Sequence, residues 1–213
     1  VLFRSADNYN NKGLVFHNDE NYKKAINNYD SAMGYTSKVS VTALFNLGNA
    51  WFEVDKARAT KYLLDCERKS DSSKNLVQQF KALGSLMVLA YRQHDYTKGD
   101  AYYQKAAFLL KEISSPEREA KLLSWKGSLF SIRSMIDSSI YYNKKAQAIF
   151  DTVNLGEAIW TRNSLSDAYV TRGEFDKGEK LLQEALKISR DTKNAIGEGY
   201  TLQALSFLYC QQG

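Results

Sequence analysis

The chain has 213 residues, of which 44% are hydrophobic and 25% are charged, which is typical of a folded protein. The formal net charge is only +5, and lysines are scattered among acidic residues, so a nucleic-acid-binding surface is not expected of this segment. A single proline, Pro116, favours continuous helices over a loop-rich or all-β fold.

No run of about 18 apolar residues occurs, so we expect no membrane insertion by this segment. The two cysteines, Cys66 and Cys210, lie far apart in the sequence and identify neither a metal site nor a redox compartment. The location therefore stays open. The cytoplasm is slightly favoured, and a periplasmic location requires that an upstream signal peptide has been removed.

The first part of the chain has the pattern of a helical hairpin. Residues 1–5 are expected to be a lead-in, and from Ala6 small and large residues recur at steps of three and four. A polar interruption at residues 18–21 separates two such helices, which predicts an antiparallel pair. The positions on one face are Tyr9, Gly13 and Phe16 on the first helix and Ala25, Tyr29 and Ala32 on the second.

The same pattern repeats along the whole chain. The last small position of each second helix recurs at steps of 34 to 40 residues, which a single globular core has no reason to keep but stacked hairpins do. These positions are Ala32, Cys66, Ala106, Ala146 and Ala185. We interpret Cys66 as a packed small residue, because it occupies a position that is otherwise alanine.

The repeat predicts the fold class and the domain organisation. We expect an all-α, right-handed α-solenoid of about 11 helices, in one array over residues 6–213. Its units lie near residues 6–40, 41–74, 75–115, 116–153 and 154–193, with a half unit at 194–213. Because the last unit holds only a first helix, we expect truncation at the C-terminus and self-association through the exposed apolar face of that half repeat.

The clearest predicted helix start is at residues 114–117. Ser114 and Ser115 are suitable N-caps, Pro116 fits the first turn, and Glu117 favours the positive end of a helix.

These positions are similar to the signature of the tetratricopeptide repeat (TPR), in which Leu-Gly and an aromatic residue on the first helix precede Ala, an aromatic residue and Ala on the second. The best matches are Leu47, Gly48 and Trp51 on a first helix and Ala25, Tyr29 and Ala32 on a second. Met87 and Ala90 replace the usual Gly and aromatic residue in the third unit, and Asn143 replaces an aromatic residue in the fourth.

The resemblance implies a function. TPR proteins hold extended peptides or partner helices in a concave groove lined by the first helices, so we expect a non-enzymatic scaffold that binds a protein or peptide of unknown identity. Asparagine suits such a groove because its amide pairs with both N–H and C=O of a peptide backbone. The candidate groove residues are Asn10, Asn46, Asn49, Lys81, Tyr91, Arg92, Asn163 and Asp167.

One TPR subgroup grips a peptide's terminal carboxylate with a clamp of Lys, Asn and Arg residues. Asn46 and Lys81 match two elements of this clamp, but Asn10, Leu14 and Ser85 occupy the remaining positions. We therefore predict against binding of chaperone tails.

The longer period of this chain resembles TPR arrays in bacterial signalling proteins. The alternative function is therefore a sensing or regulatory segment of a larger protein with a transcription-regulator or histidine-kinase output. Sequence beyond Gly213 is expected to distinguish the two functions.

Motifs of catalysis are not found. The sequence contains no phosphate-binding glycine loop, no His-Glu-x-x-His, no Cys-x-x-Cys and no Gly-x-Ser-x-Gly, so we predict no catalytic, metal or cofactor-binding residues and no cofactor. The two histidines, His17 and His94, are interpreted as exposed turn residues.

Overall fold

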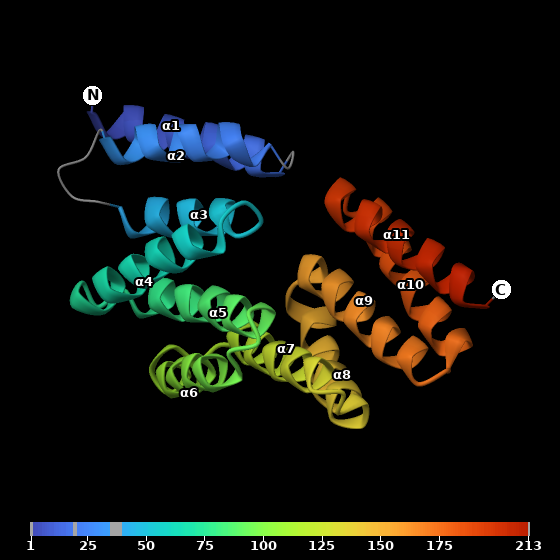
Figure 1. The fold of residues 1–213 in the computed structure, drawn as a ribbon. Coiled ribbons are helices and arrows are strands. Elements are labelled where there is room, and N and C mark those ends of the chain that lie inside the picture. The colour runs from blue at the N-terminus through green and yellow to red at the C-terminus, as the bar shows by residue number, and fades with distance from the viewer. Residues whose placement is uncertain (1, 19–20, 35–39, 213) are drawn as a thin grey trace. The chain divides into compact units, whose positions relative to one another are not determined.

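The computed structural model describes residues 2–18, 21–34 and 40–212, which are 88% helical and contain eleven helices and no strand (Figure 1). The prediction of an all-α chain with about 11 helices is confirmed. The helices are α1 (Leu2–Asn18), α2 (Tyr22–Gly34), α3 (Val41–Trp51), α4 (Lys56–Ser72), α5 (Leu76–Arg92), α6 (Tyr96–Ile113), α7 (Pro116–Ile132), α8 (Ile136–Val153), α9 (Leu155–Thr171), α10 (Phe175–Asp191) and α11 (Ala195–Gln212).

The start of the chain differs from the expectation. Helix α1 begins at Leu2, so most of the segment expected as a lead-in at residues 1–5 is helix. The physical reason is that neither proline nor glycine precedes Ala6 to prevent helix formation.

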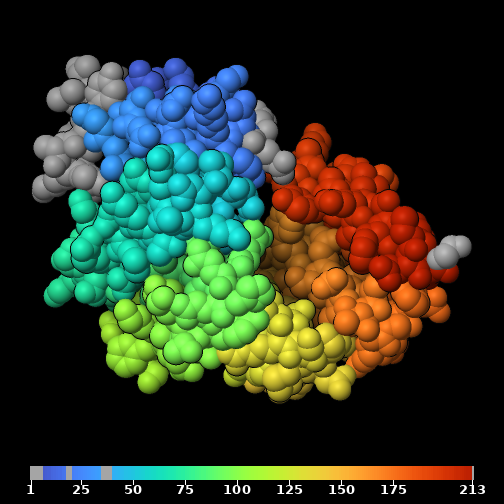
Figure 2. Space-filling model, in the orientation of Figure 1, coloured from blue at the N-terminus to red at the C-terminus, as the bar shows by residue number. Residues whose placement is uncertain are grey.

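The chain divides into two compact units, Val1–Ile113 with α1 to α6 and Ser114–Gly213 with α7 to α11. Within each unit, consecutive helices pack as antiparallel pairs: α1 with α2, α3 with α4, α5 with α6, α7 with α8, and α9 with α10. Helix α11 packs against α10 and α9. Figure 2 shows neighbouring helices of each unit in close contact over the visible face. The expectation of one continuous array over residues 6–213 stays a prediction.

The first two hairpins depend on a close approach between a small residue and a bulky one. A Cβ atom on Gly13 would lie 2.4 Å from the ring of Tyr29, and one on Gly48 would lie 2.7 Å from the side chain of Leu63. Tyr29 and Leu63 are fully buried, so neither has room to move aside. The glycines are therefore required by packing.

The third hairpin makes the same contact with the roles of its helices exchanged. Gly99 lies on the second helix, α6, and a Cβ atom there would lie 2.3 Å from the ring of Tyr91 on the first helix, α5. Ala90 occupies the position where an aromatic residue is usual, and Tyr91, one residue later, fills the space.

Short turns return the chain from one helix to the next. Four of them place a non-glycine residue, such as His94 with φ +60°, in the left-handed region. The N–H of the following residue then bonds to a carbonyl five residues earlier, as Asp95 does to Ala90 at 2.9 Å, which caps the end of α5. The predicted helix start before α7 is confirmed, because Ser115 caps the helix and Pro116 opens it.

We predict opposite effects for two glycine substitutions in the unit of α7 to α11. A Cβ atom on Gly127 would lie 2.6 Å from the buried amide of Asn143, so Gly127→Ala should lower the free energy of unfolding by about 1–3 kcal/mol. Gly199 has no neighbour within 4 Å, so Gly199→Ala should raise it by about 0.5–1 kcal/mol through helix propensity. Urea unfolding of both variants measures the effects, and equal changes in the two would contradict the packing argument.

Candidate functional site

The first helices of consecutive hairpins contact one another within each unit: α1, α3 and α5 in one, and α7, α9 and α11 in the other. Polar side chains connect them. The Asn46 Nδ2 on α3 donates to Asn10 Oδ1 on α1 at 3.0 Å, and Ser85 Oγ on α5 donates to Asn49 Oδ1 on α3 at 2.9 Å. Both pairs are separated by 36 residues, about one repeat.

The second unit has equivalent bonds. Lys121 Nζ on α7 lies 2.6 Å from Glu157 Oε1 on α9. Asn163 Nδ2 on α9 donates to Thr201 Oγ1 on α11 at 3.1 Å, and also to its own helix at the carbonyl of Ile159. Polar residues of the first helices therefore serve to bind one repeat to the next, in addition to any role toward a ligand.

Asn46 and Asn49 each use only one half of the side-chain amide for this purpose. Asn46 donates through its nitrogen, and Asn49 accepts through its oxygen. The Asn46 oxygen and the Asn49 nitrogen form no hydrogen bond with any residue that the structure describes. The two residues are three apart on α3, so they lie on one face of the helix. That face therefore presents one acceptor and one donor, the two groups that a peptide bond pairs with.

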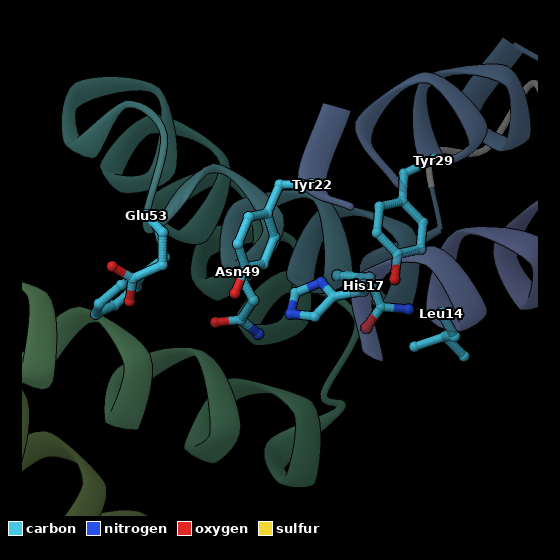
Figure 3. Close-up of a pocket in the computed structure, with 8 residues that line it drawn as sticks. Leu14, His17, Tyr22, Tyr29, Asn49 and Glu53 are labelled. Carbon is cyan, nitrogen blue, oxygen red and sulfur yellow. The ribbon is translucent and has the colours of Figure 1, made fainter. Parts of the chain in front are cut away.

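A cavity of about 390 Å³ opens next to these two amides, between α1, α2 and the end of α3 (Figure 3). Its wall is mixed, because Leu14 and Phe52 are wholly apolar whereas the other lining side chains each carry a polar group. The lining residues are Leu14, His17, Tyr22, Tyr29, Asn46, Asn49, Phe52 and Glu53.

Tyr29 carries an unsatisfied polar group in this wall. The residue is fully buried, and its hydroxyl has no hydrogen-bond partner among the described residues. In Figure 3 the hydroxyl points from α2 toward the space between His17 and Leu14. Burial raises the pKa of Tyr29 to about 12, so the group is a neutral donor and acceptor at pH 7.

His17 differs from its interpretation as an exposed turn residue, because it is half-buried and lines the cavity. Its ring packs edge-on against Tyr22 with centroids 5.5 Å apart, and burial lowers the pKa of the imidazole. His94, by contrast, is an exposed turn residue as expected. Cys66 is a buried small residue, as interpreted from its position.

Three other candidates from the sequence lie on or beside α5. Tyr91 is 2% exposed and its hydroxyl donates to Asp100 Oδ1 on α6 at 2.8 Å, so it is a packing residue and not a groove residue. Arg92 is exposed and pairs with Glu53 at 2.7 Å. Lys81 is exposed and forms no hydrogen bond or ion pair with any described residue.

The remaining two candidates, Asn163 and Asp167, lie four residues apart on α9 in the other unit. The Oδ1 atom of Asn163 is buried without a partner in the described part of the chain. Asp167 is exposed as a residue, but neighbouring groups desolvate its carboxyl and raise its pKa. The structure thus assigns the eight candidates to two separate groups and brings Asn10, Asn46 and Asn49 together around α3.

Over residues 2–18, 21–34 and 40–212, no three His, Cys, Asp or Glu side chains are grouped so that they could hold a metal ion. None of the helices described there combines the length and the apolar character needed to cross a membrane.

The fold is that of TPR-type helical-repeat proteins, as its similarity to solved structures shows. The crystal structure of a Rap protein complexed with competence and sporulation factor matches with a TM-score of 0.79 and 15% identity, covering 96% of this chain and 64% of that one. The Rap conjugation gene regulator of plasmid pLS20 in complex with the Phr* peptide matches with a TM-score of 0.76 and 15% identity, covering 92% and 60%.

A third similar structure is the apo form of the quorum sensor NprR from B. thuringiensis, with a TM-score of 0.72, 12% identity and coverage of 98% and 60%. The chain therefore spans about three fifths of the length of these proteins. No protein-family model and no curated protein sequence matches the chain.

We expect Tyr29→Phe to stabilise the protein. The substitution keeps the ring that packs on Gly13 and removes only a buried hydroxyl without a partner. Because an unsatisfied buried hydroxyl costs about 1–3 kcal/mol, the free energy of unfolding should rise by an amount in this range. Urea unfolding measures it, and a loss of stability would show that the hydroxyl has a partner in solution.

Asp167→Asn should raise the melting temperature at pH 7. The raised pKa of Asp167 means that the folded state favours the protonated carboxyl, so wild-type stability falls as pH rises through that pKa. The variant lacks this loss, and its advantage should disappear below about pH 3.9, where the carboxyl is protonated in both states. Thermal unfolding between pH 3 and 8 tests this, and a lower melting temperature of the variant at pH 7 would contradict it.

Proposed function

We propose that the chain is a non-enzymatic scaffold that binds an extended peptide against α3. The observation that carries the proposal is the pair of half-used amides, Asn46 and Asn49, on one face of α3 beside a cavity. The free Nδ2 of Asn49 donates to a peptide carbonyl, and the free Oδ1 of Asn46 accepts from a peptide N–H. Neither bond depends on the peptide's sequence, so these residues supply affinity and leave selectivity to the cavity.

The neighbouring helices support this role. The bonds from Asn46 to α1 and from Asn49 to α5 fix both side chains before a ligand arrives, which lowers the entropy lost on binding. Two of the similar structures contain a bound peptide or factor, the Rap protein with competence and sporulation factor and the Rap regulator with the Phr* peptide.

The other exposed candidates have secondary roles in this proposal. Lys81 and Arg92 lie on α5 and favour acidic residues of the peptide, although Arg92 already forms an ion pair with Glu53. Asn163 and Asp167 belong to the other unit and form a separate candidate contact surface. Nucleic acid is not among the proposed partners.

Self-association through α11 remains part of the proposal. The exposed apolar side chains of this helix include Leu202 and Tyr209, seven residues apart and so on one side, at 45% and 47%, and Phe207 on another side at 57%. Exposed apolar side chains in such number on one helix favour contact with another apolar surface.

A second candidate function is the sensing or regulatory segment of a larger bacterial signalling protein. It is supported by the similarity of the fold to a quorum sensor and to a conjugation gene regulator. The coding sequence on both sides of residues 1–213 tests it. Adjoining DNA-binding helices or a kinase domain would support this function, and a stop after one further helix would reject it.

The peptide-binding proposal is tested with a phage-displayed library of random ten-residue peptides selected on the purified chain. Enriched peptides should lose about tenfold or more in affinity when Asn46 and Asn49 are both replaced by alanine, because two hydrogen bonds of about 1 kcal/mol each are lost. Isothermal titration calorimetry measures the affinity.

The matched control is Asn27→Ala, which removes an exposed asparagine from α2 away from the cavity wall. It should leave the affinity unchanged. Full affinity of the Asn46→Ala, Asn49→Ala double variant, or failure of the library to yield any binding peptide, would count against the proposal.

A further inference from the structure

The cavity beside α3 has a polar composition that discriminates between kinds of side chain. Among its lining residues Glu53 is the only one with a formal charge at pH 7, and no lysine or arginine lines it. A carboxylate placed there would meet no lysine or arginine in the wall and would lie near the carboxylate of Glu53, which disfavours it.

A cationic side chain is not favoured either. Glu53 already pairs with Arg92 Nη1 at 2.7 Å, and the guanidinium of Arg92 lies 4.9 Å from the Phe52 ring centroid. An entering cation would have to displace or approach this arginine. The cavity is therefore suited to an uncharged occupant.

The unpaired groups in the wall indicate what that occupant carries. The Tyr29 hydroxyl has no partner, and the ring nitrogens of His17 form no hydrogen bond with any described residue. Burial disfavours the charged form of His17, so its neutral ring offers one donor and one acceptor. An apolar side chain would leave these groups unsatisfied, whereas a primary amide has both a C=O and an NH₂ group to pair with them.

From this we propose that the cavity between α1, α2 and α3 selects an asparagine or glutamine side chain of the bound peptide, with the Tyr29 hydroxyl as the specificity-determining group. The inference rests on the proposed function, in which Asn46 and Asn49 hold the backbone beside the same cavity. The volume of about 390 Å³ is large enough for the amide side chain together with its adjacent backbone.

The test uses three small probes that differ only in their side chain: the N-acetyl, N-methylamide derivatives of glutamine, glutamate and leucine. Binding is followed at pH 7.5 by the NMR signals of the His17 ring. The chain has only one other histidine, the exposed turn residue His94, which serves as an internal reference and is assigned with the His94→Gln variant.

The glutamine probe should shift the His17 signals in a saturable manner and bind about fivefold or more tightly than the glutamate probe. Tyr29→Phe should reduce the preference for glutamine over leucine about fivefold, as expected for one lost hydrogen bond, and should leave the affinity of the leucine probe unchanged. The His94 signals should not move.

The inference is overturned if glutamate binds as tightly as glutamine, if Tyr29→Phe leaves the preference for glutamine over leucine unchanged, or if no probe shifts His17. Its failure is distinguishable from failure of the proposed function. If the binding of library-derived peptides still depends on Asn46 and Asn49, the proposed scaffold function stands and only the side-chain preference of the cavity is rejected.

Discussion

The close approach of the two helices in each hairpin is the constraint on which the rest of the structure depends. Gly13 and Gly48 bring the backbones together, and Tyr29 and Leu63 fill the adjoining space. A single hairpin leaves its other faces unburied, so neighbouring hairpins must pack on them. That packing brings consecutive first helices into contact and makes their polar residues partners across one repeat.

This arrangement links stability to recognition. The hydrogen bonds between first helices use one polar atom of each of the two amides on α3, Asn46 Nδ2 and Asn49 Oδ1. They thereby hold the other polar atom of each amide in a fixed position. Tyr29 contributes to both stability and recognition. Its ring packs on Gly13, and its hydroxyl lies in the cavity wall without a partner among the described residues. A buried, unsatisfied hydroxyl lowers stability in the unbound protein, and a ligand that pairs with it recovers that free energy.

Much of the fold follows from the sequence because the packing contact repeats. Small and large residues at a step of 34 to 40 predicted the hairpins, and the pattern at residues 114–117 predicted the start of α7. Tyr91 was predicted to line the groove but is buried. Its hairpin exchanges the small and bulky positions between its two helices, which a fixed signature does not anticipate.

The site was predicted less completely than the fold. Asn46 and Asn49 were candidates by position, but which half of each amide is free depends on the register of the neighbouring first helices. The separation of 36 residues between Asn10 and Asn46 is a sequence signal that could have indicated such a bond. The sequence contains no such signal for the roles of Tyr29 and His17, because whether a polar group lacks a hydrogen-bond partner depends on side chains that are distant in the sequence.

The most direct test of the account is the NMR signal of the side-chain NH₂ groups of Asn46 and Asn49 in the ¹⁵N-labelled chain. A library-derived peptide is added, and assignments come from the single Asn→Ala variants. Because the Asn46 nitrogen already bonds to Asn10 whereas the Asn49 nitrogen is free, the Asn49 signal should shift strongly and the Asn46 signal only slightly. A shift of Asn46 with Asn49 unchanged, or no shift of either, would contradict the account.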